Sequence, residues 1–162
     1  MGAEKDQNKA TTCQRYLAVL GTLANEMMDT STVLYLGELR TELQHIRSGQ
    51  RMSTDAPVDN QGQGGAFSPT DLMATSLAAC MITTMGIVAR DKDIPLEGLK
   101  ARVVKHMASA PRRIARIEIH LELAGGRLDE RQRSIMEQTA RTCPVAQSLS
   151  PEVVQDLHLT FV

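Results

Sequence analysis

Apolar positions near the start of the chain recur at helical spacing. They predict an amphipathic helix from Cys13 to Met28, with apolar side chains at steps of three and four residues. What looks like a complete domain follows this helix. We therefore interpret residues 1–31 as an N-terminal helical extension and residues 32–162 as the main domain. Cys13 is expected to pack within the helix and to do no chemistry.

From residue 33 onward the pattern becomes that of short strands. Three are expected, at Val33–Leu36, Arg40–Ile46 and Arg51–Thr54, and glycine-containing turns separate them. This arrangement predicts an antiparallel meander. The next segment, 55–67, contains Pro57 and three glycines, which is typical of a mobile loop.

The sequence Ser68-Pro69-Thr70-Asp71 predicts the start of a long helix. Ser68 suits the N-cap, proline suits the first helical position, and Asp71 completes a capping-box pattern. The uncharged run that follows, 72–89, approaches the length of a membrane span, but it includes several Ser, Thr and Gly residues. We expect a helix that ends near Arg90 and is buried in a globular domain, with no membrane as partner.

The remaining pattern predicts two more strands, a second helix and a closing strand. The strands are expected at Leu99–Met107 and Arg113–Leu123, and the second alternates apolar with polar residues, so one of its faces is wet. Asp129 and Gln132 can cap a helix whose inner stripe leads to Cys143, and 157–161 alternates again. The expected fold class is α+β, with an antiparallel sheet packed on two cysteine-bearing helices.

Composition excludes several classes of function. The chain has 162 residues, 42% of them hydrophobic, which suits one domain with a core of its own. Only 2% are aromatic and the net charge is -1, so the chain offers neither stacking platforms nor a basic field for nucleic acid. The first ten residues are polar and hold no apolar signal segment, so a cytoplasmic location is expected.

The three cysteines carry the most informative chemistry. They are odd in number, and no CxxC or Cys/His grouping indicates a disulfide framework or a zinc site, so no metal is expected. Cys80 lies within the uncharged helix, and Cys143 lies where a helix meets Pro144. Such a pair could be two inert core residues, or it could be oxidised to an internal disulfide that is then reduced back to two thiols.

Three segments carry a resemblance to a known family. Ser68-Pro69-Thr70-Asp71-Leu72, then Leu77-Ala78-Ala79-Cys80, and later Thr142-Cys143-Pro144-Val145-Ala146 resemble the OsmC/Ohr family of osmotically inducible and organic hydroperoxide resistance proteins. The order of predicted elements also resembles that family. The resemblance extends from Val33 to Val162 and implies an intertwined homodimer with its sites at the interface.

The resemblance implies a thiol peroxidase that acts in the oxidative stress response. Cys80 would attack an organic hydroperoxide and become a sulfenic acid, and Cys143 would resolve it as a Cys80-Cys143 disulfide. An external dithiol, such as a lipoylated protein, would reduce that bond, and no cofactor would be needed. The loop 55–67 would help to cover the site around Cys80.

One position departs from the pattern of the peroxidase branches. The residue after the family proline is there a Glu that holds the catalytic Arg, whereas here it is Thr70, with Asp71 one step later. The Arg clamp could then depend on Asp71, or Asp71 could serve only as a cap. The catalytic Arg could be Arg40, Arg47 or Arg51, and Arg40 is our choice. The alternative function is a non-catalytic dimeric protein that binds a ligand or senses redox state.

The remaining candidates have ordinary structural explanations beside the functional ones. We assign a substrate pocket to five residues near the Cys80 helix, of which the methionines could equally be core: Phe67, Thr70, Met73, Met81 and Met85. The four histidines are scattered over strands and are expected to be surface or hydrogen-bonded residues. The Arg112-Arg113-Arg116 group could dock an acidic carrier protein, or it could be a solvated strand end.

Overall fold

The computed structural model describes residues 29–123 and 128–162. The predicted N-terminal helix and Cys13 therefore lie outside the described residues. The chain divides into two compact units, residues 1–54 and 55–162.

The described part of the first unit is a three-stranded sheet in the order β1-β2-β3. Its strands are β1 (Ser31–Gly37), β2 (Arg40–His45) and β3 (Arg51–Asp55), the last of which ends at the boundary with the second unit. β1 and β2 are antiparallel, with Ser31 opposite His45 and Tyr35 opposite Thr41. The antiparallel pairing predicted for these two strands is therefore confirmed. β1 exposes four consecutive apolar side chains: Val33, Leu34, Tyr35 and Leu36.

A loop with one short 3-10 helix, η1 (Val58–Asn60), connects β3 to the long helix. Its glycines allow it to fold back on itself. A Cβ atom at Gly62 would overlap the carbonyl of Ala56, so no larger residue fits there without movement of the backbone. The amide of Gly65 donates a 2.8 Å hydrogen bond to Oδ2 of buried Asp55.

The long helix α2 (Pro69–Asp91) begins at the predicted N-cap. The Ser68 hydroxyl accepts from the Asp71 amide, and the Asp71 carboxylate accepts from the Ser68 amide, so the capping box is complete. By length and composition alone α2 could cross a membrane, since its most apolar stretch has a mean hydropathy of 1.8. In this fold one stripe of α2 is buried in the core: Ala74, Leu77, Ala78, Met81, Met85 and Ala89. Only 33% of its apolar stretch is buried, so another apolar surface remains uncovered.

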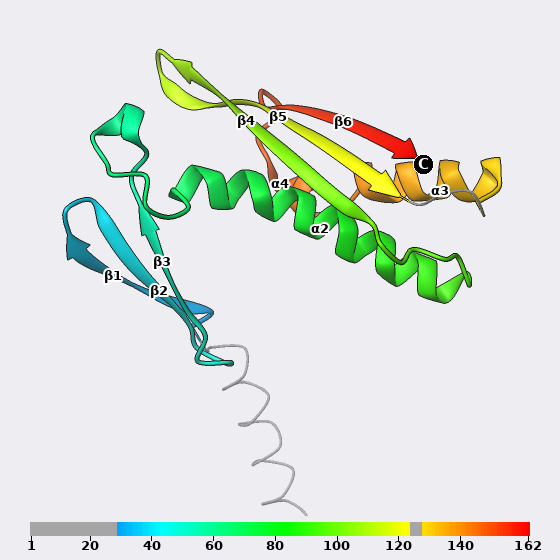
Figure 1. The fold of residues 1–162 in the computed structure, drawn as a ribbon, viewed down its shortest axis with the longest axis horizontal. Coiled ribbons are helices and arrows are strands. Elements are labelled where there is room, and N and C mark those ends of the chain that lie inside the picture. Colours follow the sequence, from blue (N-terminus) through cyan, green and yellow to red (C-terminus); the bar gives the residue numbers. More distant parts are fainter. Residues whose placement is uncertain (1–28, 124–127) are drawn as a thin grey trace, which may run out of the picture. The chain divides into compact units, whose positions relative to one another are not determined.

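The second sheet has the order β4-β5-β6 and lies over the helices of its unit (Figure 1). β4 (Lys100–Ser109) and β5 (Arg112–Leu123) are antiparallel. β6 (Val154–Phe161) pairs with β5 in parallel, because α3 and α4 return the chain to the same end of the sheet before it re-enters. As predicted, alternate residues of β5 face the core: Ile117, Ile119, Leu121 and Leu123.

Two further helices complete the core. α3 (Glu130–Arg141) begins with the predicted capping box of Asp129 and Gln132, and α4 (Pro144–Ser148) follows at once. Both contact α2, and Met136 and Ala140 of α3 are fully buried against the core. The predicted α+β class, with a sheet packed on helices, is confirmed. In this sheet the β4-β5 pair is antiparallel, as predicted, and the β5-β6 pair is parallel.

Candidate active site

The two cysteines of the second unit meet in its core. Cys80 is a half-buried residue in the middle of α2, and Cys143 is the fully buried N-cap residue of α4. The two thiols are neighbours, and the Cys80 thiol helps to raise the pKa of Cys143. Both are free thiols in this structure. Packing of α4 on α2 therefore brings together two sulfurs that are far apart in sequence.

The surroundings of Cys143 favour its neutral form. Burial raises the pKa of the Cys143 thiol, and the neighbouring Cys80 thiol raises it further. Hydrogen bonds from the backbone amides of Ala146 and Val145 act in the opposite direction without reversing the shift. Cys143 is thus a protonated, fully buried thiol, whereas Cys80 is only partly buried.

A polar cluster occupies the N-terminus of α2. The ammonium of Lys105, on β4, lies 2.7 Å from Oδ1 of Asp71, 2.7 Å from Oγ1 of Thr70 and 3.4 Å from Oγ of Ser68. Burial alone would raise the pKa of Asp71, but the hydrogen bonds from Lys105 and Ser68 outweigh it and hold that pKa below its usual value. Asp71 is therefore a charged cap that is paired with a lysine.

Lys105 was not predicted as a site residue from the sequence. The alternation of β4 does contain a signal for it. Residues 103, 105 and 107 share one face of the strand, and Val103 and Met107 are apolar, so that face is expected to point toward the core. A lysine on the core-facing side of a strand needs an anionic or polar partner, because an unpaired buried charge is costly. The carboxylate of Asp71 and the hydroxyl of Thr70 are those partners.

The other predicted site residues lie in three settings. Arg40 starts β2 of the first unit, so its role at Cys80 stays a prediction. Phe67 and Met73 are exposed in the second unit. Met81 and Met85 are fully buried core residues, which is the structural alternative that the sequence left open.

The predicted basic group near the start of β5 is ion-paired. Arg112 binds Asp59 at 3.1 Å, and Arg113 lies 3.6 Å from Glu152. Arg116 binds Glu118 at 2.8 Å and Asp156 at 3.3 Å. The solvated, paired strand end agrees better with these contacts than a free basic surface does.

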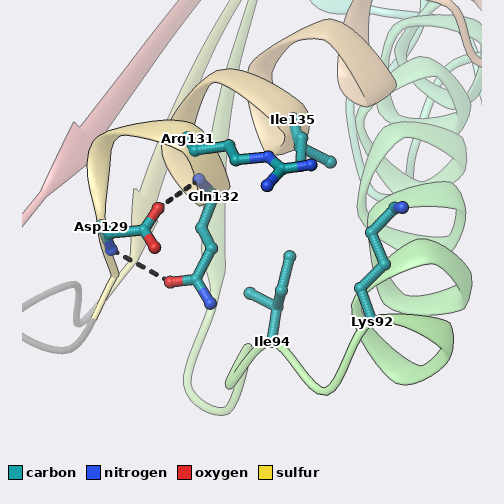
Figure 2. A pocket seen from close by; sticks show the side chains of 6 residues that line it. All are labelled: Lys92, Ile94, Asp129, Arg131, Gln132 and Ile135. Carbon is teal, nitrogen blue, oxygen red and sulfur yellow. Dashed lines mark hydrogen bonds between the residues drawn. The ribbon is translucent and has the colours of Figure 1, made fainter.

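A hollow of about 350 Å³ lies between the end of α2 and the start of α3 (Figure 2). Figure 2 shows Lys92 on one side, the capped Asp129-Gln132 pair on the other, and Ile94 between them. Arg131 and Ile135 complete its lining. Neither Cys80 nor Cys143 lines this hollow, so it is separate from the thiol pair.

Comparison with known proteins identifies the family. The family model described as OsmC-like protein matches residues 62–158, a span that holds both cysteines and the helix cap. The chain belongs to the OsmC/Ohr family. The resemblance seen in the sequence motifs is thereby confirmed. A search of curated proteins gave no match.

Solved OsmC-like structures share this fold. A candidate osmotic stress induced and detoxification response protein from Psychrobacter arcticus 273-4 is 49% identical with a TM-score of 0.78, over 82% of this chain and 96% of that one. An organic hydroperoxide resistance protein OsmC from Legionella pneumophila is 20% identical with a TM-score of 0.65, over 82% and 98% of the two chains. An organic hydroperoxide resistance protein from Elizabethkingia anophelis is 15% identical with a TM-score of 0.64, over 84% and 99% of the two chains. The last two identities are low and establish the fold alone.

Proposed function

We propose that this OsmC-like protein is a thiol peroxidase that reduces organic hydroperoxides. The observation that carries the proposal is the pair of neighbouring thiols, one on a partly buried residue and the other on a fully buried one. A peroxide that enters from solvent reaches Cys80 first. The second thiol is then already in place to remove the oxidised product.

The proposed cycle has three steps, each balanced in atoms and electrons. The thiolate of Cys80 attacks the terminal oxygen of the hydroperoxide; the O–O bond breaks, the alkoxide leaves and takes a proton as alcohol, and Cys80 becomes a sulfenic acid. The thiol of Cys143 attacks that sulfur, which forms the disulfide and releases water. An external dithiol, such as a reduced lipoyl group, exchanges with the disulfide and restores both thiols.

The structure offers Cys143 features suited to a resolving role. Its raised pKa keeps it protonated and unreactive toward peroxide until the sulfenic acid forms beside it. The amides of Val145 and Ala146, which hydrogen-bond its sulfur, stabilise the thiolate that must leave when the disulfide is reduced. The cytoplasm is the compartment that we propose, because its reducing poise returns both thiols to the active form.

A homodimer is part of the proposal. Only 33% of the apolar stretch of α2 is buried, and two of its large apolar side chains are exposed, Met73 at 44% and Ile87 at 49%. The apolar side chains of β1 are exposed as well. A second copy of the chain could cover these surfaces and enclose the Cys80 side of α2, as the family resemblance implies. Light scattering on the purified protein measures this directly.

A coupled turnover assay tests the enzymatic proposal. With a dithiol as reductant, the wild type should consume cumene hydroperoxide faster than hydrogen peroxide, and Cys80→Ser should lose this activity. Cys143→Ser should still form the Cys80 sulfenic acid, which dimedone traps, but should make no internal disulfide. The matched control is Cys13→Ser, which should retain turnover. Wild-type consumption no faster than that of Cys80→Ser would reject the peroxidase.

A non-catalytic binding or redox-sensing role is the second candidate, and the Asp71 cluster favours it. The carboxylate of Asp71 is engaged with the helix cap and with Lys105, and position 70 has a hydroxyl where the resemblance leads us to expect Glu. Alkylation of Cys80 across a pH series separates the two roles. A peroxidase thiolate reacts well below pH 8.5, about the reference pKa of a free cysteine, whereas an inert thiol reacts only near that value.

A further inference from the structure

The outer face of the second sheet carries a repeated sequence pattern that the proposed peroxidase does not use. β5 contains Glu118-x-His120 and β6 contains Asp156-x-His158. The parallel register sets Glu118 opposite Asp156 and His120 opposite His158. Because residues two apart on a strand share a face, all four side chains emerge on the side opposite the buried isoleucines of β5.

The four side chains converge on one another. Nε2 of His120 lies 2.6 Å from Oε1 of Glu118, and Nε2 of His158 lies 3.1 Å from Oδ1 of Asp156. The two imidazole rings stack with centroids 4.7 Å apart and planes inclined by 13°. This separation matches the spacing of neighbouring strands, which is about 4.7–4.9 Å, so the backbone pairing itself holds the rings side by side.

We propose that this cluster is a binding site for a divalent transition-metal ion of the Zn²⁺ type. Two imidazole nitrogens and two carboxylate oxygens form a four-ligand set that such ions accept. One ligand atom each from Glu118, His120 and His158 already lie within 4.8 Å of one another. In a tetrahedral zinc site two nitrogens stand about 3.3 Å apart, so the ligand atoms would have to approach one another by up to about 1.5 Å to bind an ion.

The neighbouring residues orient these ligands and balance their charge. Arg116 binds the outer oxygens of both carboxylates, Oε2 of Glu118 at 2.8 Å and Oδ2 of Asp156 at 3.3 Å. The inner oxygens, Oε1 and Oδ1, are those that face the histidines. His106 adds a further contact to Oε2 of Glu118 at 3.0 Å. Such outer partners fix the orientation of metal-binding carboxylates.

The charge of the cluster suits a dication. Two carboxylates and one guanidinium give the group a net charge of about -1 when the histidines are neutral, which is the form that binds metal. The carboxylates have 20% and 31% of their side-chain surface exposed, so an ion can reach them from solvent. A bound ion would join β6, the last strand of the chain, to β5.

Isothermal titration of the full-length protein with ZnCl₂ tests this proposal. The wild type should bind one equivalent of Zn²⁺ and show a raised Tm with added metal, while Mg²⁺ should neither bind nor shift Tm. His120→Gln/His158→Gln should bind at least about 100-fold more weakly. Asp156→Asn is the milder variant, expected to lose about tenfold, and far-UV circular dichroism verifies that each variant folds.

Two controls assign the binding to this cluster. His45→Gln removes a histidine of the first unit, where it hydrogen-bonds Ser48, and should bind Zn²⁺ as the wild type does. A variant in which serine replaces Cys13 and Cys80 and alanine replaces Cys143 should also retain the site. The proposal is overturned if the wild type shows no saturable binding, if the double histidine variant binds as tightly as the wild type, or if only the cysteine variant loses binding.

Discussion

The Lys105→Met substitution tests whether the polar cluster at the N-terminus of α2 stabilises the fold. Methionine is similar to lysine in length and apolar, so it fills the same space without opening a cavity. What is lost is one ammonium that contacts Asp71, Thr70 and Ser68. The Asp71 carboxylate would keep its contacts with Ser68 but would lose its counter-charge.

The expected loss follows from the burial of the two groups. The Lys105 side chain is 16% exposed and that of Asp71 is 37% exposed. Hydrogen bonds to charged groups contribute about 1.5–3 kcal/mol each when buried, but solvent screening at Asp71 reduces this. We therefore expect Lys105→Met to lower the free energy of unfolding by about 2 kcal/mol, with a coupling of about 1 kcal/mol to Asp71→Asn in a double-mutant cycle.

Urea unfolding followed by far-UV circular dichroism is the assay, since the chain contains no tryptophan for fluorescence. The matched control is Lys100→Met, an exposed lysine at the start of the same strand, which should change the free energy of unfolding by less than about 0.5 kcal/mol. The reasoning is refuted if Lys105→Met has no larger effect than Lys100→Met. It is also refuted if the double-mutant cycle shows no coupling to Asp71.

Three further predictions concern acid stability, packing and thiol access. Burial raises the pKa of Asp71, but the hydrogen bonds from Lys105 and Ser68 lower it overall, so the folded pKa lies below the unfolded value of about 3.9. The stabilisation of the fold by the Asp71 carboxylate is therefore present above the unfolded pKa and is lost as pH falls through the folded pKa. In urea unfolding, the stability advantage of the wild type over Asp71→Asn should shrink below about pH 4. Met136→Ala should lower the free energy of unfolding by about 2–5 kcal/mol in the same assay, because the Met136 side chain is fully buried. The control Gln138→Ala, at an exposed position of the same helix, should change it by less than about 0.5 kcal/mol, and equal effects of the two substitutions would contradict the packing. Iodoacetamide should modify Cys80 before Cys143 in the folded protein, because Cys143 is fully buried with a raised pKa; peptide mapping that finds the reverse order would contradict the site geometry.

Local signals in the sequence predicted the elements well. The caps of α2 and α3 involve residues within one helical turn, so Ser68, Asp71, Asp129 and Gln132 could be read directly from their spacing. The alternation of β5 likewise needs only neighbours two residues apart. These local signals alone place Cys80 and Cys143 on or beside core helices.

These local signals do not predict which segments that are far apart in the sequence lie side by side in the fold. No local pattern shows that β6 lies parallel to β5, and that pairing is what brings His158 to His120. The bond between Lys105 and Asp71 also depends on how β4 packs against α2. For the same reason the sequence motifs suggested that Cys80 and Cys143 act together, but only the packing of α4 on α2 brings their side chains into contact.

The most direct test of the central claim is peptide mapping by mass spectrometry after the reduced protein receives one equivalent of cumene hydroperoxide. We predict a peptide pair linked by Cys80 and Cys143, with the loss of two hydrogens and with Cys13 still free. After reduction by a dithiol the link should disappear, and a second equivalent of peroxide should restore it. Two unmodified thiols after exposure, or a bridge that uses Cys13 instead, would contradict the proposed cycle.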